Sequence, residues 1–256
     1  MNFLIQLYHL ILLQPLLNGL VLLYVFLPGH DLGVAVIVLT LIIRLILHPV
    51  SLKGLKSQKV LSSLQPKIKE VREKFKNDRQ GQSAAMMELY RKEKISPLSG
   101  CLPLLLQLPI IIALYQVFLR ATDSQFLVDN LYSFVPNPGV MSTTFLGVFQ
   151  LQDKTFALVI AILAGLAQFW QAKIASPNTT GTGGKGDIAS MLQKQMLYVF
   201  PVLTVFIIYK IGGLIGIYWL FSTLVSVAEQ YLANHVRNKV SNGANHRLNT
   251  PEAKVK

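Results

Sequence analysis

The sequence predicts an all-α fold of the polytopic membrane class, with a five-helix transmembrane bundle, an N-terminal interfacial helix and a cytoplasmic helical hairpin. Composition is the first observation behind this prediction: 52% of the residues are hydrophobic and only 14% are charged, against about 25% charged in ordinary soluble domains. The second is that several apolar runs reach the length of about 20 residues that a spanning helix needs. The third is an uneven distribution of basic residues, which predicts topology.

The basic residues follow a clear pattern along the 256-residue chain, whose formal net charge is +12. No Lys or Arg precedes Arg44, so the basic region of a secretory signal peptide is missing and no cleavage is expected. Residues 53–95 carry twelve Lys or Arg against five acidic residues. Because basic segments stay on the cytoplasmic side of a membrane, this distribution places residues 53–96 in the cytoplasm.

Polar side chains interrupt the apolar run at the N-terminus. Gln6, Gln14 and Asn18 share one helical face, and Pro15 disrupts the middle of the run. This pattern favours a helix across residues 1–28 that lies in the membrane interface and is broken near Pro15. The alternative is a sixth transmembrane helix, because the run is apolar enough to cross the bilayer.

The first predicted span, residues 29–52, carries a single arginine well inside its apolar run. An arginine at membrane depth costs about 2.5–3.5 kcal/mol on insertion scales, so it usually faces a bundle interior or a wet cavity. Thr40, Arg44 and His48 lie one above another at helical spacing. Arg44 either extends its guanidinium to the nearby headgroups or presents its charge inside a water-accessible groove, and the shared polar stripe favours the groove.

The basic segment 53–96 is predicted to form an antiparallel helical hairpin. Its apolar residues recur at alternating spacings of three and four, the pattern of a helix that packs against a partner. Asn77, Asp78 and Gly81 break this helix, and a second short helix follows. Two roles stay open: a solvated element beside anionic lipid headgroups, or a docking arm for another protein or for ribosomal RNA.

The rest of the chain alternates apolar spans with polar connections. Residues 121–152 contain no Lys or Arg and belong outside the cell, whereas the tail is basic and is expected to be a disordered cytoplasmic arm. The assignments are a second span at 97–120, an extracytoplasmic segment at 121–152, a third span at 153–175, a flexible cytoplasmic loop at 176–190, a fourth span at 191–210, a fifth span at 214–234 and the tail at 235–256.

A second polar stripe follows the fifth span, where Tyr218, Ser222, Ser226 and Glu229 succeed one another at helical spacing. At 1.5 Å per residue, Glu229 and Arg44 both lie roughly 20 Å below the outer face. Glu229 is therefore a candidate charge partner of Arg44, unless it simply sits at the interface.

Asp187, in the 176–190 loop, is the other acidic residue that is a candidate charge partner of Arg44. Gln107, in the second span, is expected to form a hydrogen bond between helices.

Several stretches of this sequence, in order and with matching charge topology, resemble the YidC-type membrane protein insertases, the YidC/Oxa/Alb group, from about Leu13 to Leu232. The resemblance is to the short form, without the large extracytoplasmic domain. The stretches are QPLLNGLV, LTLIIRLILHPVSLKGLKSQKVLSSLQPKIKEVREKF, MMELYRKEKISPLSGCLPLLLQLPIIIALYQVF, FPVLTVFII and GIYWLFSTLVSVAEQ.

The resemblance implies a multi-pass protein of the bacterial plasma membrane that inserts and folds nascent membrane proteins through a hydrophilic groove, alone or beside the Sec translocon. In that groove Arg44 would receive the polar or acidic segment of the substrate, with Thr40, Gln107, Tyr218 and Trp219 as lining or substrate-facing residues. We add His48 and Ser222 from the two polar stripes. Anionic lipid and, through the basic hairpin and tail, the ribosome are further candidate partners, and the chain is expected to work as a monomer.

Other classes of function fit the sequence less well. A secondary transporter would show inverted repeats with broken helices in corresponding positions, and no such symmetry is evident. An enzyme would need a clustered nucleophile, base or metal-ligand set, but the five histidines are scattered. The glycines near residue 184 lack the spacing of a phosphate-binding loop. No cofactor or metal is therefore expected, and the single Cys101 excludes an intrachain disulfide.

Overall fold

The fold was analysed in a computed structural model that describes residues 2–93, 102–121, 123–175 and 195–248. Within these ranges the chain is helical almost throughout, and its two strands are only two residues long each. The predicted all-α membrane class is confirmed. The predicted 176–190 loop lies outside the described residues.

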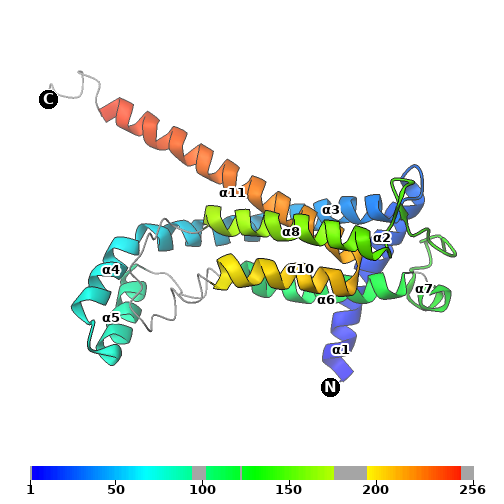
Figure 1. The fold of residues 1–256 in the computed structure, drawn as a ribbon, viewed down its shortest axis with the longest axis horizontal. Helices are drawn as coiled ribbons and strands as arrows, with labels where there is room; N and C mark the ends of the chain where they lie inside the picture. The colour runs from blue at the N-terminus through cyan, green and yellow to red at the C-terminus, as the bar shows by residue number, and fades with distance from the viewer. Residues whose placement is uncertain (1, 94–101, 122, 176–194, 249–256) are drawn as a thin grey trace.

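The N-terminal segment forms one helical rod with a local distortion. Helix α1 (Asn2–Tyr8) passes through a π-helical turn, η1 (His9–Leu13), into α2 (Gln14–Phe26). Pro15 stands at the start of α2, where the wider π turn accommodates a residue without an N–H group. We expected a break near Pro15, and the chain instead stays helical there. Figure 1 shows α1 projecting away from the other helices.

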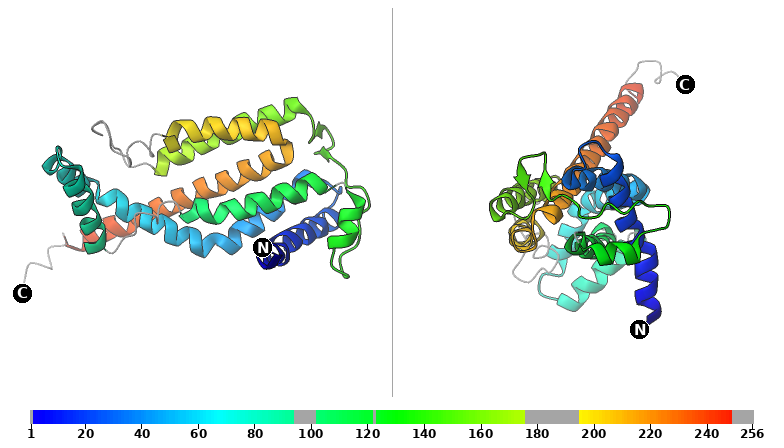
Figure 2. Two further views of the ribbon diagram at one scale, coloured as in Figure 1. Left: turned by 90° about the horizontal axis from the view of Figure 1, so that it is seen from below. Right: turned by 90° about the vertical axis from the view of Figure 1, so that its right-hand side faces the viewer.

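Helix α3 (Leu32–Ser63) is longer than the predicted span. The Asp31 side chain caps its start by accepting a hydrogen bond from the Val34 N–H at 3.0 Å. Pro49 lies inside the helix, which removes one backbone hydrogen bond and favours a bend. Figure 2 shows that α3 is bent but unbroken. The predicted boundary at residue 52 is therefore not the end of a helix.

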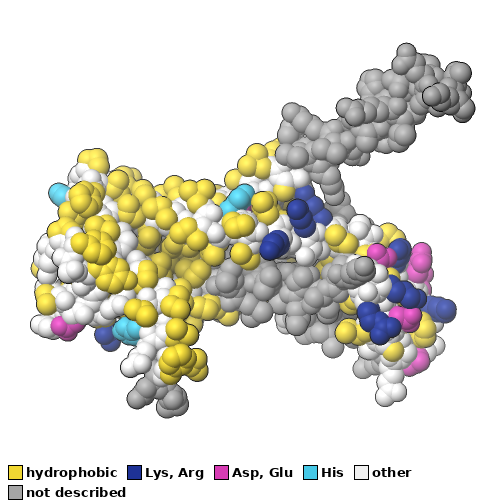
Figure 3. Space-filling model, turned by 180° about the vertical axis from the view of Figure 1, so that it is seen from behind, with side chains coloured by type: hydrophobic (Ala, Val, Ile, Leu, Met, Phe, Trp, Pro, Cys, Tyr) yellow, Lys and Arg dark blue, Asp and Glu magenta, His cyan; other side chains and the backbone are white. Residues whose placement is uncertain are grey.

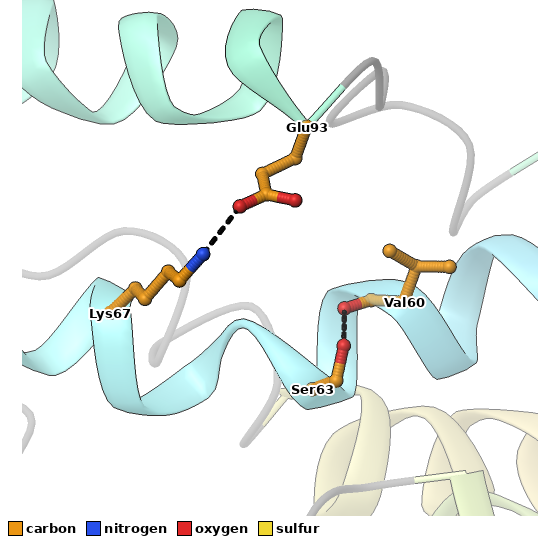
Figure 4. A network of polar contacts seen from close by, with 4 residues as sticks. All are labelled: Val60, Ser63, Lys67 and Glu93. Atoms are coloured by element: carbon orange, nitrogen blue, oxygen red, sulfur yellow. Dashed lines mark hydrogen bonds and ion pairs between the residues drawn. The ribbon is translucent and has the colours of Figure 1, made fainter. Parts of the chain in front are cut away.

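A short helical hairpin follows, made of α4 (Gln65–Lys74) and α5 (Arg79–Lys92), which pack against each other. Asp78 caps α5 through the Gly81 N–H at 2.9 Å. At the junction with α3, the Ser63 hydroxyl donates to the Val60 carbonyl, and Lys67 pairs with Glu93 at 2.6 Å (Figure 4). Figure 3 shows charged side chains gathered over this end, while hydrophobic side chains cover the bundle.

The second half of the chain completes the bundle. We expected residues 235–256 to be disordered, but the last helix continues unbroken as far as Leu248 and extends beyond the bundle (Figure 1). The elements in order are α6 (Leu102–Arg120), α7 (Ser124–Asn130), the antiparallel strands β1 (Thr144–Phe145) and β2 (Phe149–Gln150), α8 (Lys154–Ala175), the π-helical turn η3 (Gln195–Val199), α10 (Phe200–Ile211) and α11 (Gly213–Leu248).

Small residues allow the helices of the bundle to pack closely. Helix α11 lies against α8 and α3, and α10 lies against α8. A Cβ atom on Gly165 would come within 2.6 Å of Val205, and one on Gly216 within 2.7 Å of Ile160. Membrane helices commonly approach one another through such small residues. Gly165 therefore allows α8 to lie close to α10, and Gly216 allows α11 to lie close to α8.

Three helical stretches are long and apolar enough to cross a membrane: Phe3–Phe26, Leu32–Ser63 and Lys154–Ala175. The apolar stretches Gln107–Arg120 and Gln195–Ile211 are shorter within the described residues. The first of the three is the segment that we expected to lie in the interface, so its length also suits the alternative of a sixth span. Its orientation in the bilayer stays a prediction.

Candidate functional site

Arg44 is held between two helices of the bundle. Its side chain is half-buried, and its Nε donates a hydrogen bond to Ser222 Oγ on α11 at 2.9 Å. The Nη2 group donates to the same oxygen. Ser222 is only 4% exposed. The guanidinium of α3 therefore points toward α11, and its hydrogen bonds among the described residues go to a neutral hydroxyl.

Polar side chains continue from Ser222 to a third helix. Tyr218 lies one turn earlier on α11, is 2% exposed, and its hydroxyl interacts with that of Ser222. Tyr218 Oη in turn accepts a hydrogen bond from Gln107 Nε2 of α6. The structure thus joins the side chains of α3, α11 and α6 in one chain of polar contacts, with Arg44 at one end.

Glu229 lies beside this cluster but contacts another residue directly. Its Oε1 accepts a hydrogen bond from His48 Nδ1 at 2.5 Å, and its side chain is 10% exposed against 46% for His48. Arg44 is close enough to feel the charge of Glu229. The direct partner of this carboxylate among the described residues is nevertheless His48, on the same helix as Arg44.

The remaining predicted site residues lie apart from this cluster or are not described. Thr40 is 1% exposed, and its hydroxyl donates to the Val36 carbonyl of its own helix at 2.6 Å. Trp219 is partly buried against the hydrophobic core. Asp187 lies outside the described residues. The structure therefore gathers Arg44, His48, Gln107, Tyr218, Ser222 and Glu229, and turns Thr40 toward its own backbone.

Two polar residues near the cluster were not singled out from the sequence. Gln230 is 8% exposed, and its Oε1 has no hydrogen-bond partner in the described part of the chain. It follows Ser222 and Ser226 at a spacing of four, so the helical periodicity could have identified it. Lys59 on α3 donates to the Ala233 carbonyl of α11 at 2.7 Å. Nothing in the sequence distinguishes Lys59 from the other basic residues nearby.

The cluster offers a fixed cation and neutral hydrogen-bonding groups within an apolar bundle. A guanidinium in such surroundings attracts carboxylates and donates hydrogen bonds to polar segments. In the described ranges no group of three or more His, Cys, Asp or Glu side chains is arranged to hold a metal ion. The chemistry that this arrangement supports is therefore binding of a polar or acidic group at membrane depth.

The fold and the cluster together define a multi-pass α-helical membrane protein with a polar site inside the bundle. Comparison with known proteins gives its family: the chain belongs to the 60Kd inner membrane protein family, whose model matches residues 23–240. It is 35% identical over 202 residues to a membrane protein insertase YidC of Fusobacterium nucleatum, an alignment that covers 78% of this chain and 84% of that protein.

Longer relatives match over the same share of this chain. The YidC insertases of Francisella tularensis subsp. novicida and subsp. tularensis are each 33% identical over 200 residues, which is 78% of this chain but 32% of theirs. The chain thus spans about a third of the length of these relatives. Together, the family and its members support a membrane protein insertase role and a multi-pass location in the bacterial plasma membrane.

Proposed function

We propose that this chain inserts nascent membrane proteins through a hydrophilic groove in which Arg44 receives the polar or acidic segment of the substrate. Ser222, Tyr218, Gln107 and His48 would line this groove beside Arg44. Thr40 and Trp219 are the other residues that we assign to the groove, with Thr40 as part of its supporting wall because its hydroxyl bonds to its own helix.

The physical problem that such a groove solves is dehydration. A hydrated segment that crosses about 30 Å of hydrocarbon loses its water with no replacement. Crossing is therefore slow, because the polar groups are left without hydrogen-bond partners. A cation and hydroxyl groups held part-way across shorten the apolar distance. Once the flanking hydrophobic segment reaches lipid, burial of about 20 apolar residues drives the step. Nucleotide hydrolysis by this chain is therefore not needed in the proposed mechanism.

The single observation that carries the proposal is the environment of the Arg44 guanidinium. It lies within an apolar helix, is half-buried, and donates to Ser222 rather than to a carboxylate among the described residues. A buried charge is costly unless it is paired, so a structural arginine would be expected to hold an acidic partner. A guanidinium with only a hydroxyl as its direct partner retains the capacity to attract an acidic substrate segment.

The topology and partners of the chain form part of the same proposal. We place the hairpin of α4 and α5 and the end of α11 in the cytoplasm, because the basic residues are concentrated there. This surface would meet anionic lipid headgroups and, through nonspecific phosphate contacts, the ribosome. We further propose that the chain acts as a monomer, either alone or beside the Sec translocon.

Reconstitution of the purified chain in liposomes tests the role of Arg44. Protease protection of the translocated end of a short single-span substrate measures insertion. We expect Arg44→Ala to reduce insertion of a substrate with an acidic translocated segment about tenfold or more, because a charge-assisted contact is lost. Arg44→Lys keeps the charge and should be much milder.

A substrate whose translocated segment lacks acidic residues provides the control, since it should depend less on Arg44. Equal insertion of the acidic substrate by the wild type and by Arg44→Ala would reject the proposal. Detergent unfolding curves of both variants establish that any loss does not come from misfolding.

A further inference from the structure

Helices α3 and α11 meet in two successive layers of polar contacts. In the first layer, Arg44 donates to Ser222. In the second, one helical turn further along α3, His48 Nδ1 donates to Glu229 Oε1 at 2.5 Å. The contact of Lys59 with the Ala233 carbonyl follows further along both helices. The two helices therefore run in the same direction, and the second layer places the one carboxylate of this stripe close to Arg44.

Glu229 binds one donor directly, His48, and lies within electrostatic range of a second, Arg44. Its side chain is 10% exposed, so the carboxylate needs a hydrogen-bond donor to remain charged at low cost. Arg44 lies within range of its charge, and an arginine–carboxylate pair is among the strongest and most directional contacts in proteins. Such a pair would offset the charge of the guanidinium and occupy up to two of its donors.

We propose that His48 is a positioning residue that holds Glu229 away from Arg44 and thereby keeps the guanidinium available to the substrate. This inference rests on the proposed function of Arg44. His48 binds the carboxylate through Nδ1–H and stabilises it in the second layer. Loss of this donor releases Glu229 to pair with Arg44, so that an acidic substrate segment must compete with an internal carboxylate for the same cation.

The test compares three variants in the liposome assay with the acidic single-span substrate. His48→Ala removes the donor, and we expect insertion to fall about tenfold, as for the loss of one charge-assisted contact. His48→Asn places an amide nitrogen near the position of Nδ1, and we expect it to keep most of the activity. In the double variant His48→Ala/Glu229→Gln no carboxylate remains to pair with Arg44, and we expect insertion to recover to within about twofold of the wild type.

The double variant separates this role from a purely structural one. If the contact of His48 with Glu229 only joined α3 to α11, the double variant would be as defective as His48→Ala, and that outcome would overturn the inference. Unchanged insertion by His48→Ala would overturn it as well. Gln125→Ala is the matched control, because it removes an amide that donates to Asp129 at 3.0 Å between two exposed side chains of α7, far from Arg44 along the chain.

The Arg44 variants show which proposal fails. If Arg44→Ala inserts the acidic substrate normally, the proposed function itself is wrong. If Arg44→Ala is defective and His48→Ala is not, only the positioning role of His48 is wrong.

Discussion

The two ends of the bundle are held together by different kinds of contact. At the end formed by α7, β1 and β2, side chains from the N-terminal half bind the backbone of the 121–152 segment. Asn18 donates to the Asn130 carbonyl at 3.0 Å and accepts from the Tyr132 N–H at 2.7 Å. Toward the hairpin end, contacts between side chains predominate, namely Arg44 with Ser222, His48 with Glu229 and Lys67 with Glu93. One side chain there, Lys59, binds a backbone carbonyl, that of Ala233.

This difference indicates which end is able to change. Further bonds to the backbone join Tyr24 Oη to the Ser142 N–H at 2.8 Å and Asp31 to the Leu146 N–H at 2.5 Å. A backbone group that loses its partner away from water is costly, and the bonds of Asn18 are partly buried, so this end resists opening. Contacts between two flexible side chains exchange partners more readily. We therefore expect the α7 end to act as the closed side of the protein, and the hairpin end as the side where a substrate enters.

The largest effect is expected from Asn18→Ala at the closed end. Asn18 is 2% exposed, and its loss leaves two backbone groups of the 121–152 segment without their partner. We expect destabilisation by about 2–3 kcal/mol, since buried unsatisfied groups cost about 1–3 kcal/mol each. Thermal unfolding in detergent measures it. Asn137→Ala is the control: this exposed side chain accepts from the nearby Gly139 N–H, so its effect should stay below about 0.5 kcal/mol.

Tyr24→Phe is expected to have an intermediate effect at the same end. Tyr24 is 7% exposed, and the change removes only the oxygen that accepts from the Ser142 N–H. The ring is kept, so the packing should be preserved, and we expect a loss of about 1 kcal/mol. The same unfolding assay, together with faster proteolysis of the 121–152 segment, checks this. A Tyr24→Phe protein as stable as the wild type would mean that the backbone bonds contribute little to closure.

Lys67→Ala is expected to have a smaller effect, because it removes an exposed ion pair at the hairpin end. The side chains of Lys67 and Glu93 are 57% and 32% exposed, and such surface pairs contribute about 0–1 kcal/mol. We expect the unfolding temperature to change less than for Tyr24→Phe. The comparison between the two ends would be contradicted if Lys67→Ala were the more destabilising of the two.

The smallest effect concerns pH. A hydrogen bond and the charge of Lys92 lower the pKa of Glu88 below its ordinary value. A carboxylate with a lowered pKa contributes stability above its unfolded pKa, and this stability is lost as the pH falls through the lowered folded value. The Glu88 side chain is 57% exposed, so the contribution is small. We expect Lys92→Ala to differ slightly from the wild type in unfolding temperature at pH 7, and not at all at pH 2.

Much of the fold follows from local sequence patterns, and the exceptions have physical reasons. Apolar length and the charge distribution predict the helical membrane class. Pro49 suggested the end of a helix, but the remaining turns of α3 form hydrogen bonds on both sides of it, so the helix continues to Ser63. The tail has few apolar residues, which predicted disorder, and yet α11 continues to Leu248 as an extension of an established helix.

The contacts within the candidate site could not be predicted, because they depend on how two helices are rotated relative to each other. Helical spacing places Thr40, Arg44 and His48 on one stripe, but it does not give the rotation of α3 against α11. That rotation decides that Arg44 meets Ser222, that Glu229 meets His48, and that Thr40 bonds to its own backbone. Such pairings depend on how α3 packs against α11, which the pattern of a single helix does not give.

The continuity of α3 has a mechanical consequence. The helix that carries Arg44 ends only at Ser63, where the hairpin begins, and this stretch spans about 28 Å at 1.5 Å per residue. A continuous helix of this length couples the hairpin to the site, so we expect a tilt of the hairpin to shift the position of the guanidinium. Pro49, which lacks an N–H group, is the point at which α3 is expected to bend most easily and so to weaken this coupling.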